Sequence, residues 1–212
     1  MGKSKTITMK NLITLIIILT SVHSFSQKNL EEIIKTNEEY RAELNESYKD
    51  SLHSPLKREA RLKFEAFPFY PIDTAYYVVA KFERSKKGKS FRMKTSTDRK
   101  PVYKVFGVAT FTINGVSHEL TIYQNIGLLK NPEYEDYLFL PFNDYTNGGE
   151  TYGGGRYLDL KIPEGNTIVL DFNKAYNPYC AYTYGYSCPV PPRENSLKTE
   201  IKAGIKYEEI ED

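Results

Sequence analysis

The chain has 212 residues, with 29 Lys and Arg against 27 Asp and Glu, and a formal net charge of +2. This length suits one domain with a sizeable core, and the near balance of charge excludes the strongly basic surface typical of nucleic-acid-binding proteins. Tyrosine is abundant (18 residues) and tryptophan is absent, which favours a β-rich protein with many half-buried aromatic positions.

Residues 1–26 predict a secretory signal peptide. Three lysines precede an apolar run over residues 12–19, and Ser24 and Ser26 place small side chains where a signal peptidase reads them. We therefore place cleavage before Gln27 and expect an exported protein, periplasmic or extracellular. A retained membrane anchor is the alternative, but the apolar run is shorter than the roughly 20 residues that span a bilayer. Removal leaves 26 Lys and Arg against 27 Asp and Glu, so the mature chain is nearly neutral and has no predicted membrane span.

A helical segment is predicted over residues 27–66, before a β domain over residues 67–207. The main helix runs from Asn29 to about Asp50, and a short second helix covers Pro55–Phe64. We interpret the main helix as packed on the body of the protein rather than as a membrane or partner-binding helix. Its predicted inner face, at helical spacing, consists of Leu30, Ile33, Ile34, Asn37, Tyr40, Leu44 and Tyr48.

The clearest strand prediction is a hairpin of Val102–Ile113 and Val116–Gln124. Its turn is Asn114-Gly115, the pair best suited to the positive φ angles of a type I′ turn. The turn sets the register, which pairs Phe111 with His118 and turns His118 toward the apolar side of the sheet. Gly107 predicts a bulge or bend in the first of these strands.

Six other stretches of the chain also predict strands. Ala75–Glu83 and Phe91–Thr95 are predicted to pair as a hairpin around a basic turn, and Leu138–Phe142 is a separate strand. Arg156–Ile162 and Thr167–Phe172 predict a further hairpin, and Leu197–Lys206 a last strand. The sequence therefore predicts a mainly β fold of about eight strands, an antiparallel sandwich or barrel with an N-terminal helix.

Polar and aromatic residues crowd into Phe142–Asn195, where ordinary core residues are few. Arg156, at the start of a strand, needs a carboxylate partner if it is buried, or it binds an anionic ligand through its planar guanidinium. We expect side chains from two parts of this segment to converge around it. The candidate ligand-binding residues are Asp144, Glu150, Tyr152, Arg156, Asp171, Asn173, Tyr176 and Asn177.

Metal and phosphate sites are not expected in this segment. The loop that begins at Asp144 resembles a calcium loop, but Gly155 stands where the bidentate Glu is required. The glycine triplet 153–155 lacks the Gly-Lys-Ser/Thr ending of a phosphate loop and is better explained by a tight backbone crossing. No metal and no cofactor are predicted.

Cys180 and Cys188 are the two cysteines of the chain. An exported protein meets an oxidising compartment, so a disulfide between them is the first expectation. A zinc site is disfavoured because the mature chain retains only His53 and His118. A Cys–His–Asp nucleophile that uses His118 is the remaining alternative.

Three motifs of this segment resemble the domain of unknown function 1684 family: FxDxTxGxETYxxGRYLD from Phe142, DFNxAYNPxCAY from Asp171, and CPxPPxEN from Cys188. The resemblance covers Leu30 to Lys206, carried by pattern rather than by motif in the first half. The family usually ends in Ala-Gly-Glu, whereas here Ala203-Gly204 precedes Ile205, so any site that uses this Glu would be incomplete. The resemblance implies no activity, because the family has none established.

Three hypotheses about function remain open. In the first, an exported protein binds a small polar or anionic ligand, or a protein partner, through the candidate residues. In the second, the protein is a hydrolase-like enzyme with Asp171 or Glu150 as general base and Arg156 holding the substrate's charge. In the third, the polar cluster is purely structural, a hydrogen-bond network beneath a loop rich in Tyr and Pro.

Overall fold

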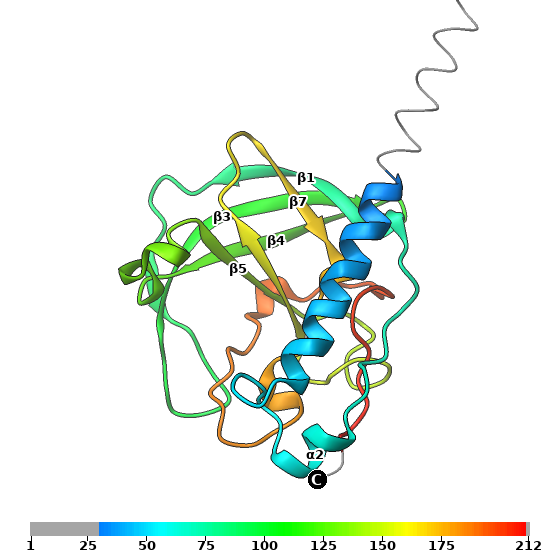
Figure 1. The fold of residues 1–212 in the computed structure, drawn as a ribbon. Helices are drawn as coiled ribbons and strands as arrows, with labels where there is room; N and C mark the ends of the chain where they lie inside the picture. The colour runs from blue at the N-terminus through cyan, green and yellow to red at the C-terminus, as the bar shows by residue number, and fades with distance from the viewer. Residues whose placement is uncertain (1–29, 211–212) are drawn as a thin grey trace, which may run out of the picture.

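The computed structural model describes residues 30–210, so the predicted signal peptide lies outside the described residues. Within this range, seven antiparallel strands form one curled sheet, and a helix over residues 30–49 packs beside it (Figure 1). The mainly β fold with an N-terminal helix is therefore confirmed. The strands are β1 Tyr77–Arg84, β2 Ser90–Arg92, β3 Val102–Ile113, β4 Val116–Asn125, β5 Tyr137–Phe142, β6 Arg156–Lys161 and β7 Thr167–Asp171.

The hairpin of β3 and β4 forms as its turn predicts. Asn114 and Gly115 have φ angles of 52° and 76°, and Phe111 pairs with His118. His118 is buried, with its ring 5.7 Å from that of Phe111. The register shifts by one residue next to Gly107, which confirms the predicted bulge.

The strand order is β6-β5-β4-β3-β1-β7, so β6 and β7 are the two edges of the sheet. The predicted hairpin of Arg156–Ile162 with Thr167–Phe172 is wrong, although both strands exist. β6 pairs along its whole length with β5, and β7 with β1. Because the sheet curls, its two edges come near each other, and the short turn over residues 163–166 crosses between them without pairing the strands.

The predicted pairing of the first two strands is also wrong. β1 pairs with Gly107–Thr110 and β2 with Val102–Lys104, both on β3. β4 occupies the other side of β3, so β1 and β2 follow each other along one edge. β3, with 12 residues, is long enough to hold both strands in succession.

The predicted last strand, Leu197–Lys206, is an irregular segment instead. Gly204 has a φ of 77°, which interrupts an extended chain, and the residue makes backbone contact with Tyr70 rather than joining a ladder. Single bridges, such as Phe69 with Ile205, replace continuous pairing. Its buried side chains, Leu197, Ile201, Ala203 and Ile205, fill gaps in the core.

The two faces of the sheet have different neighbours. On β5, Leu138 and Leu140 point into the main core, so the alternation of a strand turns Tyr137 and Phe139 to the opposite face. β6 repeats this arrangement, with Leu158 in the main core. The opposite face is covered by the N-terminal helix and by a loop that follows β7.

The N-terminal helix is fixed to the body by polar and aromatic contacts. Asn37, which is fully buried, donates a hydrogen bond of 2.8 Å to the Asp171 carboxylate at the end of β7. One turn further on, Arg41 donates to the carbonyl of Tyr70. Tyr48 packs edge-on against Phe67, near the short helix α2 (Arg58–Lys63). No helix in the described part of the chain has the length and apolar character needed to cross a membrane.

Candidate functional site

The guanidinium of Arg156 lies inside the protein, with no exposed surface. Its Nη2 donates to Asp144 Oδ2 and to the carbonyl of Ile201, at 2.8 Å each. Its Nη1 donates to the carbonyls of Ala203 (2.5 Å) and Ile205 (3.3 Å). Arg156 thus ties the start of β6 to the irregular C-terminal segment.

Asp144, the partner of Arg156, is equally well satisfied. Its Oδ1 accepts hydrogen bonds from the backbone and hydroxyl of Thr146, at 2.8 and 2.6 Å, and from the backbone of Ile201. Just before Arg156, Gly155 has a φ of 87°, and a side chain there would meet the carbonyl of Phe142 at 2.8 Å. Arg156 Nε is the one buried donor of this pair without a hydrogen-bond partner within residues 30–210. A buried ion pair whose remaining groups bond the backbone of several segments is typical of a structural anchor.

Asp171 and Asn173 form a second group, at the end of β7. Asp171 accepts hydrogen bonds from Asn37 and from both the backbone and side chain of Asn173. The amide of Asn173 also bonds the backbone N–H and carbonyl of Asp73. This group joins the helix, β7 and the chain before β1, and it does not contact Arg156.

The other candidates are spread over the surface and the loop after β7. Glu150 forms exposed ion pairs with Lys202 and Lys206. Asn177 is buried and donates to the hydroxyl of Tyr182, and Tyr152 donates a long hydrogen bond to the carbonyl of Cys180. Among the eight candidates, Asp144 is the one that hydrogen-bonds Arg156, so the predicted convergence around the guanidinium is limited to this pair.

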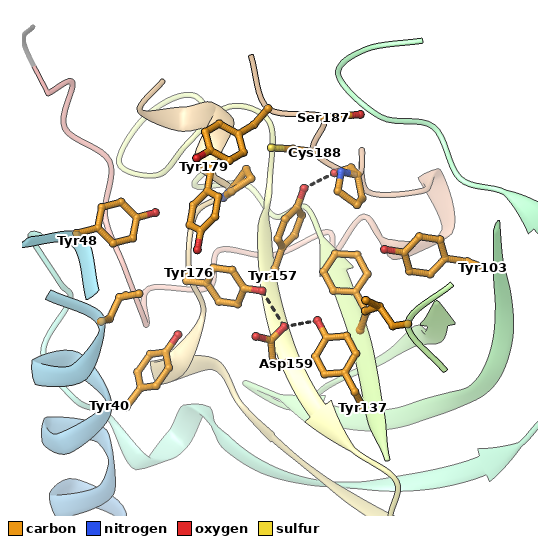
Figure 2. Close-up of a pocket in the computed structure, with 16 residues that line it drawn as sticks. Tyr40, Tyr48, Tyr103, Tyr137, Tyr157, Asp159, Tyr176, Tyr179, Ser187 and Cys188 are labelled. Atoms are coloured by element: carbon orange, nitrogen blue, oxygen red, sulfur yellow. Dashed lines mark hydrogen bonds between the residues drawn. The ribbon is translucent and has the colours of Figure 1, made fainter. Parts of the chain in front are cut away.

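A pocket of about 450 Å³ opens on the face of the sheet opposite the main core (Figure 2). Of the predicted candidates, Tyr176 alone lines it. Four parts of the fold form its walls: the N-terminal helix, strands β3, β5 and β6, the loop over residues 176–189, and Leu128 of the short 3-10 helix Leu128–Lys130. Eight tyrosines of the described residues contribute to the lining.

The strands supply the floor of the pocket through their alternation. Tyr157 and Asp159 are two residues apart on β6, and Tyr137 and Phe139 are two apart on β5. Phe139 lies directly opposite Asp159 in the ladder. Residues at i and i+2 share a face, so these four side chains lie together under the opening. Tyr103 of β3 extends the same surface.

The helix and the loop supply the rim. Tyr40 and Tyr48 lie two turns apart on the inner face of the helix, as predicted from the spacing, and both line the pocket. Across from them, Tyr176, Tyr179 and Tyr186 come from the loop. Figure 2 shows Tyr40 and Tyr48 on the helix side of the pocket and Tyr176 beside the Asp159 carboxylate.

The disulfide shapes this loop. Cys180 and Cys188 are bonded, as predicted, and Cys188 with its neighbours Ser187 and Pro189 forms part of the pocket wall. Backbone hydrogen bonds connect the loop to the chain between β2 and β3, for example from Ser96 N–H to the carbonyl of Cys188. The disulfide closes the loop on itself, and these backbone hydrogen bonds fix the position of the loop relative to the sheet.

Asp159 is the charged residue of the pocket. Its Oδ1 accepts hydrogen bonds from the hydroxyls of Tyr137 and Tyr176, at 2.7 Å each. Asp159 is an exposed residue that reaches solvent through the opening, while the neighbouring rings partly desolvate its carboxylate. This desolvation raises the pKa of Asp159, and the two tyrosine hydrogen bonds partly offset the effect.

The negative charge also acts on the tyrosines around it. Burial is the main cause that raises the pKa of Tyr40, Tyr137 and Tyr176, and the Asp159 carboxylate raises each of them further. These phenols therefore stay protonated at physiological pH, and Tyr137 and Tyr176 donate hydrogen bonds to Asp159. No group of three or more His, Cys, Asp or Glu side chains suited to a metal ion occurs within residues 30–210.

Asp159 is not among the candidate ligand-binding residues that the sequence indicates. A signal was present nevertheless, because Tyr157 and Asp159 alternate with Leu158 and Leu160 on a predicted strand. An acid on the aromatic side of such a strand does not contribute to an apolar core, which indicates a polar function for that face. What the sequence alone does not supply is the pairing of β6 with β5, which brings Tyr137 to the same carboxylate.

The chain matches the family model described as "Protein of unknown function (DUF1684)" over residues 62–206. It is also similar to the solution NMR structure of an uncharacterized protein from gene locus rrnAC0354 of Haloarcula marismortui. The two share 31% sequence identity with a TM-score of 0.66, over 84% of this chain and 96% of that chain. Among curated proteins, none matches. Because the family model spans more than half of its residues, the chain belongs to the DUF1684 family of proteins of unknown function.

Proposed function

We propose that this protein binds a small organic molecule in the pocket lined by tyrosines. The observation that carries the proposal is the pocket itself, open to solvent, about 450 Å³ in volume and lined by aromatic rings around one carboxylate. This size lies within the range of roughly 300–1,000 Å³ that is usual for ligand sites, and a mainly apolar lining with few polar groups is their usual chemistry.

The pocket supports a different ligand from the one that the sequence suggests. Arg156 has no exposed surface and bonds only protein groups, so an anionic ligand has no access to it. Asp159 is the charged group among the described lining residues. A carboxylate at the base of a partly desolvated pocket repels anions. We therefore place the small-molecule site at Asp159 rather than at Arg156.

Two substitutions to tryptophan test whether the pocket is the binding site. Leu128 lines the pocket, and its neighbour Leu129 is 37% exposed and does not. Leu128→Trp should fill the cavity and remove any small molecule that native mass spectrometry finds on the purified protein. Leu129→Trp adds the same group outside the cavity and should retain it. Equal retention in both variants, or fragment binding by NMR that avoids the Tyr137 and Tyr157 signals, would place binding elsewhere.

An acid–base reaction is the second candidate function. Burial raises the pKa of Asp159, and the carboxylate accepts hydrogen bonds from the hydroxyls of Tyr137 and Tyr176. A carboxylate with a raised pKa inside a pocket is typical of many general bases. Asp171 is occupied by two asparagines, and Glu150 lies on the surface among lysines, so Asp159 is the stronger candidate than either. Hydrolysis of small esters or amides that Asp159→Asn abolishes would favour this candidate over binding alone.

Export is the proposed location of this function. The supporting observations are the lysine-rich, apolar start of the sequence and the disulfide, which is typical of oxidising compartments. Mass spectrometry of the protein recovered from the periplasm or medium should find Gln27 at the N-terminus. Recovery of the full-length chain from the cytoplasm alone would contradict the proposal.

A further inference from the structure

We infer that the pocket binds an alkylated ammonium cation, of the kind that choline carries, with Asp159 as the counter-charge and tyrosine rings as the walls. The inference rests on the proposed function, that the pocket is a binding site, and adds the chemical class of the ligand. Charge, ring geometry and hydrogen-bond capacity support it independently.

The charge of the pocket favours a cation. Asp159 is acidic, and no Lys, Arg or His is among the described lining residues. Both tyrosine hydroxyls donate to Oδ1, and within residues 30–210 no hydrogen bond reaches Oδ2. One carboxylate oxygen is therefore held in place by protein, while the other is left for a ligand. The influence of this charge extends to Tyr40, whose pKa burial raises and Asp159 raises further.

The rings form a box rather than a flat surface. The ring of Tyr157 lies nearly perpendicular to that of Tyr176 (88°, centroids 5.7 Å apart) and steeply inclined to that of Phe139 (72°, 4.8 Å). On the rim, Tyr179 and Tyr186 meet at 74°. Rings at such angles present π faces from several directions, and the face of a tyrosine attracts a cation within about 6 Å of its centroid. Figure 2 shows Tyr137 and Tyr176 on either side of Asp159, with the rings of Tyr40 and Tyr157 nearby.

The hydrogen-bond capacity distinguishes an alkylated ammonium from other cations. A calcium ion takes about six to eight oxygen ligands, whereas the pocket offers one carboxylate. A primary ammonium has three N–H donors that each need an acceptor when desolvated. An alkylated ammonium carries its charge on carbon-covered nitrogen and makes few such demands. It therefore suits a lining made mostly of ring carbon with one free carboxylate oxygen.

A pair of probes of equal shape tests the role of charge. Choline and 3,3-dimethyl-1-butanol differ by a quaternary nitrogen in place of a quaternary carbon, so apolar contacts are matched. Isothermal titration calorimetry or NMR titration of the disulfide-bonded protein should find that choline binds more tightly by about tenfold or more, as expected for cation–π and ion-pair terms together. Shifts should concentrate on the signals of Tyr137, Tyr157 and Tyr176.

Matched variants locate the charge that is responsible. Asp159→Asn keeps an acceptor for both tyrosine hydroxyls but removes the charge, and it should weaken choline by about tenfold while leaving the alcohol unchanged. Asp136→Asn is the control, because Asp136 precedes β5, pairs with Lys161 outside the pocket and should leave both probes unaffected. Tyr179→Leu removes a ring at the rim that is 43% exposed, and it should weaken choline binding more than binding of the alcohol.

Each remaining outcome overturns the inference. Equal affinity for choline and its neutral analogue would show a pocket that binds apolar groups without regard to charge, and the proposed function would stand while the inference fails. Choline affinity that is the same in Asp159→Asn would remove the counter-charge. Binding of neither probe at millimolar concentration would end the inference, and the tryptophan variants at positions 128 and 129 would then decide the proposed function separately.

Discussion

The Asp159 carboxylate of β6 and the hydroxyl of Tyr176 lie 2.7 Å apart, and this bond joins the edge of the sheet to the loop that follows β7. Tyr137 donates to the same oxygen from β5. The Asp159 carboxylate therefore connects β5 and the loop after β7 to β6. The same bonds stabilise its ionised form against the desolvation that the pocket imposes.

Tyr176→Phe should therefore raise the pKa of Asp159 further, since it removes one of the two bonds that lower it. The carboxyl carbon signal of Asp159, followed by NMR as a function of pH, measures this directly. Tyr184→Phe is the control, because the ring of Tyr184 is 97% exposed and should leave the titration unchanged. An unaltered pKa in Tyr176→Phe would show that this hydrogen bond does not stabilise the charge.

Asp159 should also make stability depend on pH. Its pKa in the folded state is raised above the ordinary value of 3.8, so the folded protein binds a proton more readily than the unfolded chain. The contribution of Asp159 to the free energy of unfolding is therefore largest below pH 3.8. It should fall as the pH rises through the raised pKa of the folded state.

Asp159→Asn should remove this part of the pH dependence. Urea unfolding of both proteins at a series of pH values gives the comparison, and the stability of the variant relative to the original protein should increase toward neutral pH. The Asp136→Asn protein serves as the control for loss of one surface carboxylate. Parallel curves for the original protein and Asp159→Asn would contradict the assignment of a raised pKa.

The sequence supports some features of this structure because they are local. Positive φ angles at Asn114 and Gly115 are a property of those two residues, and the hairpin register follows from them. Two cysteines eight positions apart in an expected export product have few alternatives to pairing with each other. The helical spacing that joins Asn37, Tyr40 and Tyr48 on one face is equally local.

The features that the sequence does not determine depend on which strands become neighbours. Arg156–Lys161 has a pattern that suits pairing with either Thr167–Asp171 or Tyr137–Phe142, and the curled sheet selects the second. With that choice, Asp159 meets Tyr137 and the pocket forms. The need of a buried Arg156 for a carboxylate partner follows from its chemistry, and Asp144 is that partner. Its three carbonyl acceptors depend on the course of the C-terminal segment, which no local sequence pattern predicts.

The disulfide should contribute to the stability of the fold. On the chain-entropy account, closing a loop of this length stabilises the fold by about 2.5 kcal/mol, so Cys180→Ala combined with Cys188→Ala should lose about that amount in guanidinium unfolding. The original protein under reducing conditions should match the double variant. Labelling of the native protein should find no free thiol, because both cysteines are bonded. Two reactive thiols in the exported protein would contradict the pairing.

Arg156→Met should destabilise the fold strongly, since it leaves the buried Asp144 carboxylate without its counter-charge and three carbonyls without a donor. Breaking a buried pair from one side costs about 3–5 kcal/mol, which equilibrium urea unfolding can measure. Adding Asp144→Asn should recover part of the loss, because the orphaned charge is removed. Lys161→Met, at the exposed pair with Asp136, is the matched control and should change stability little. A folded Arg156→Met protein of unchanged stability that has lost its small-molecule ligand would instead return the binding site to Arg156 and contradict the structural role argued for this ion pair.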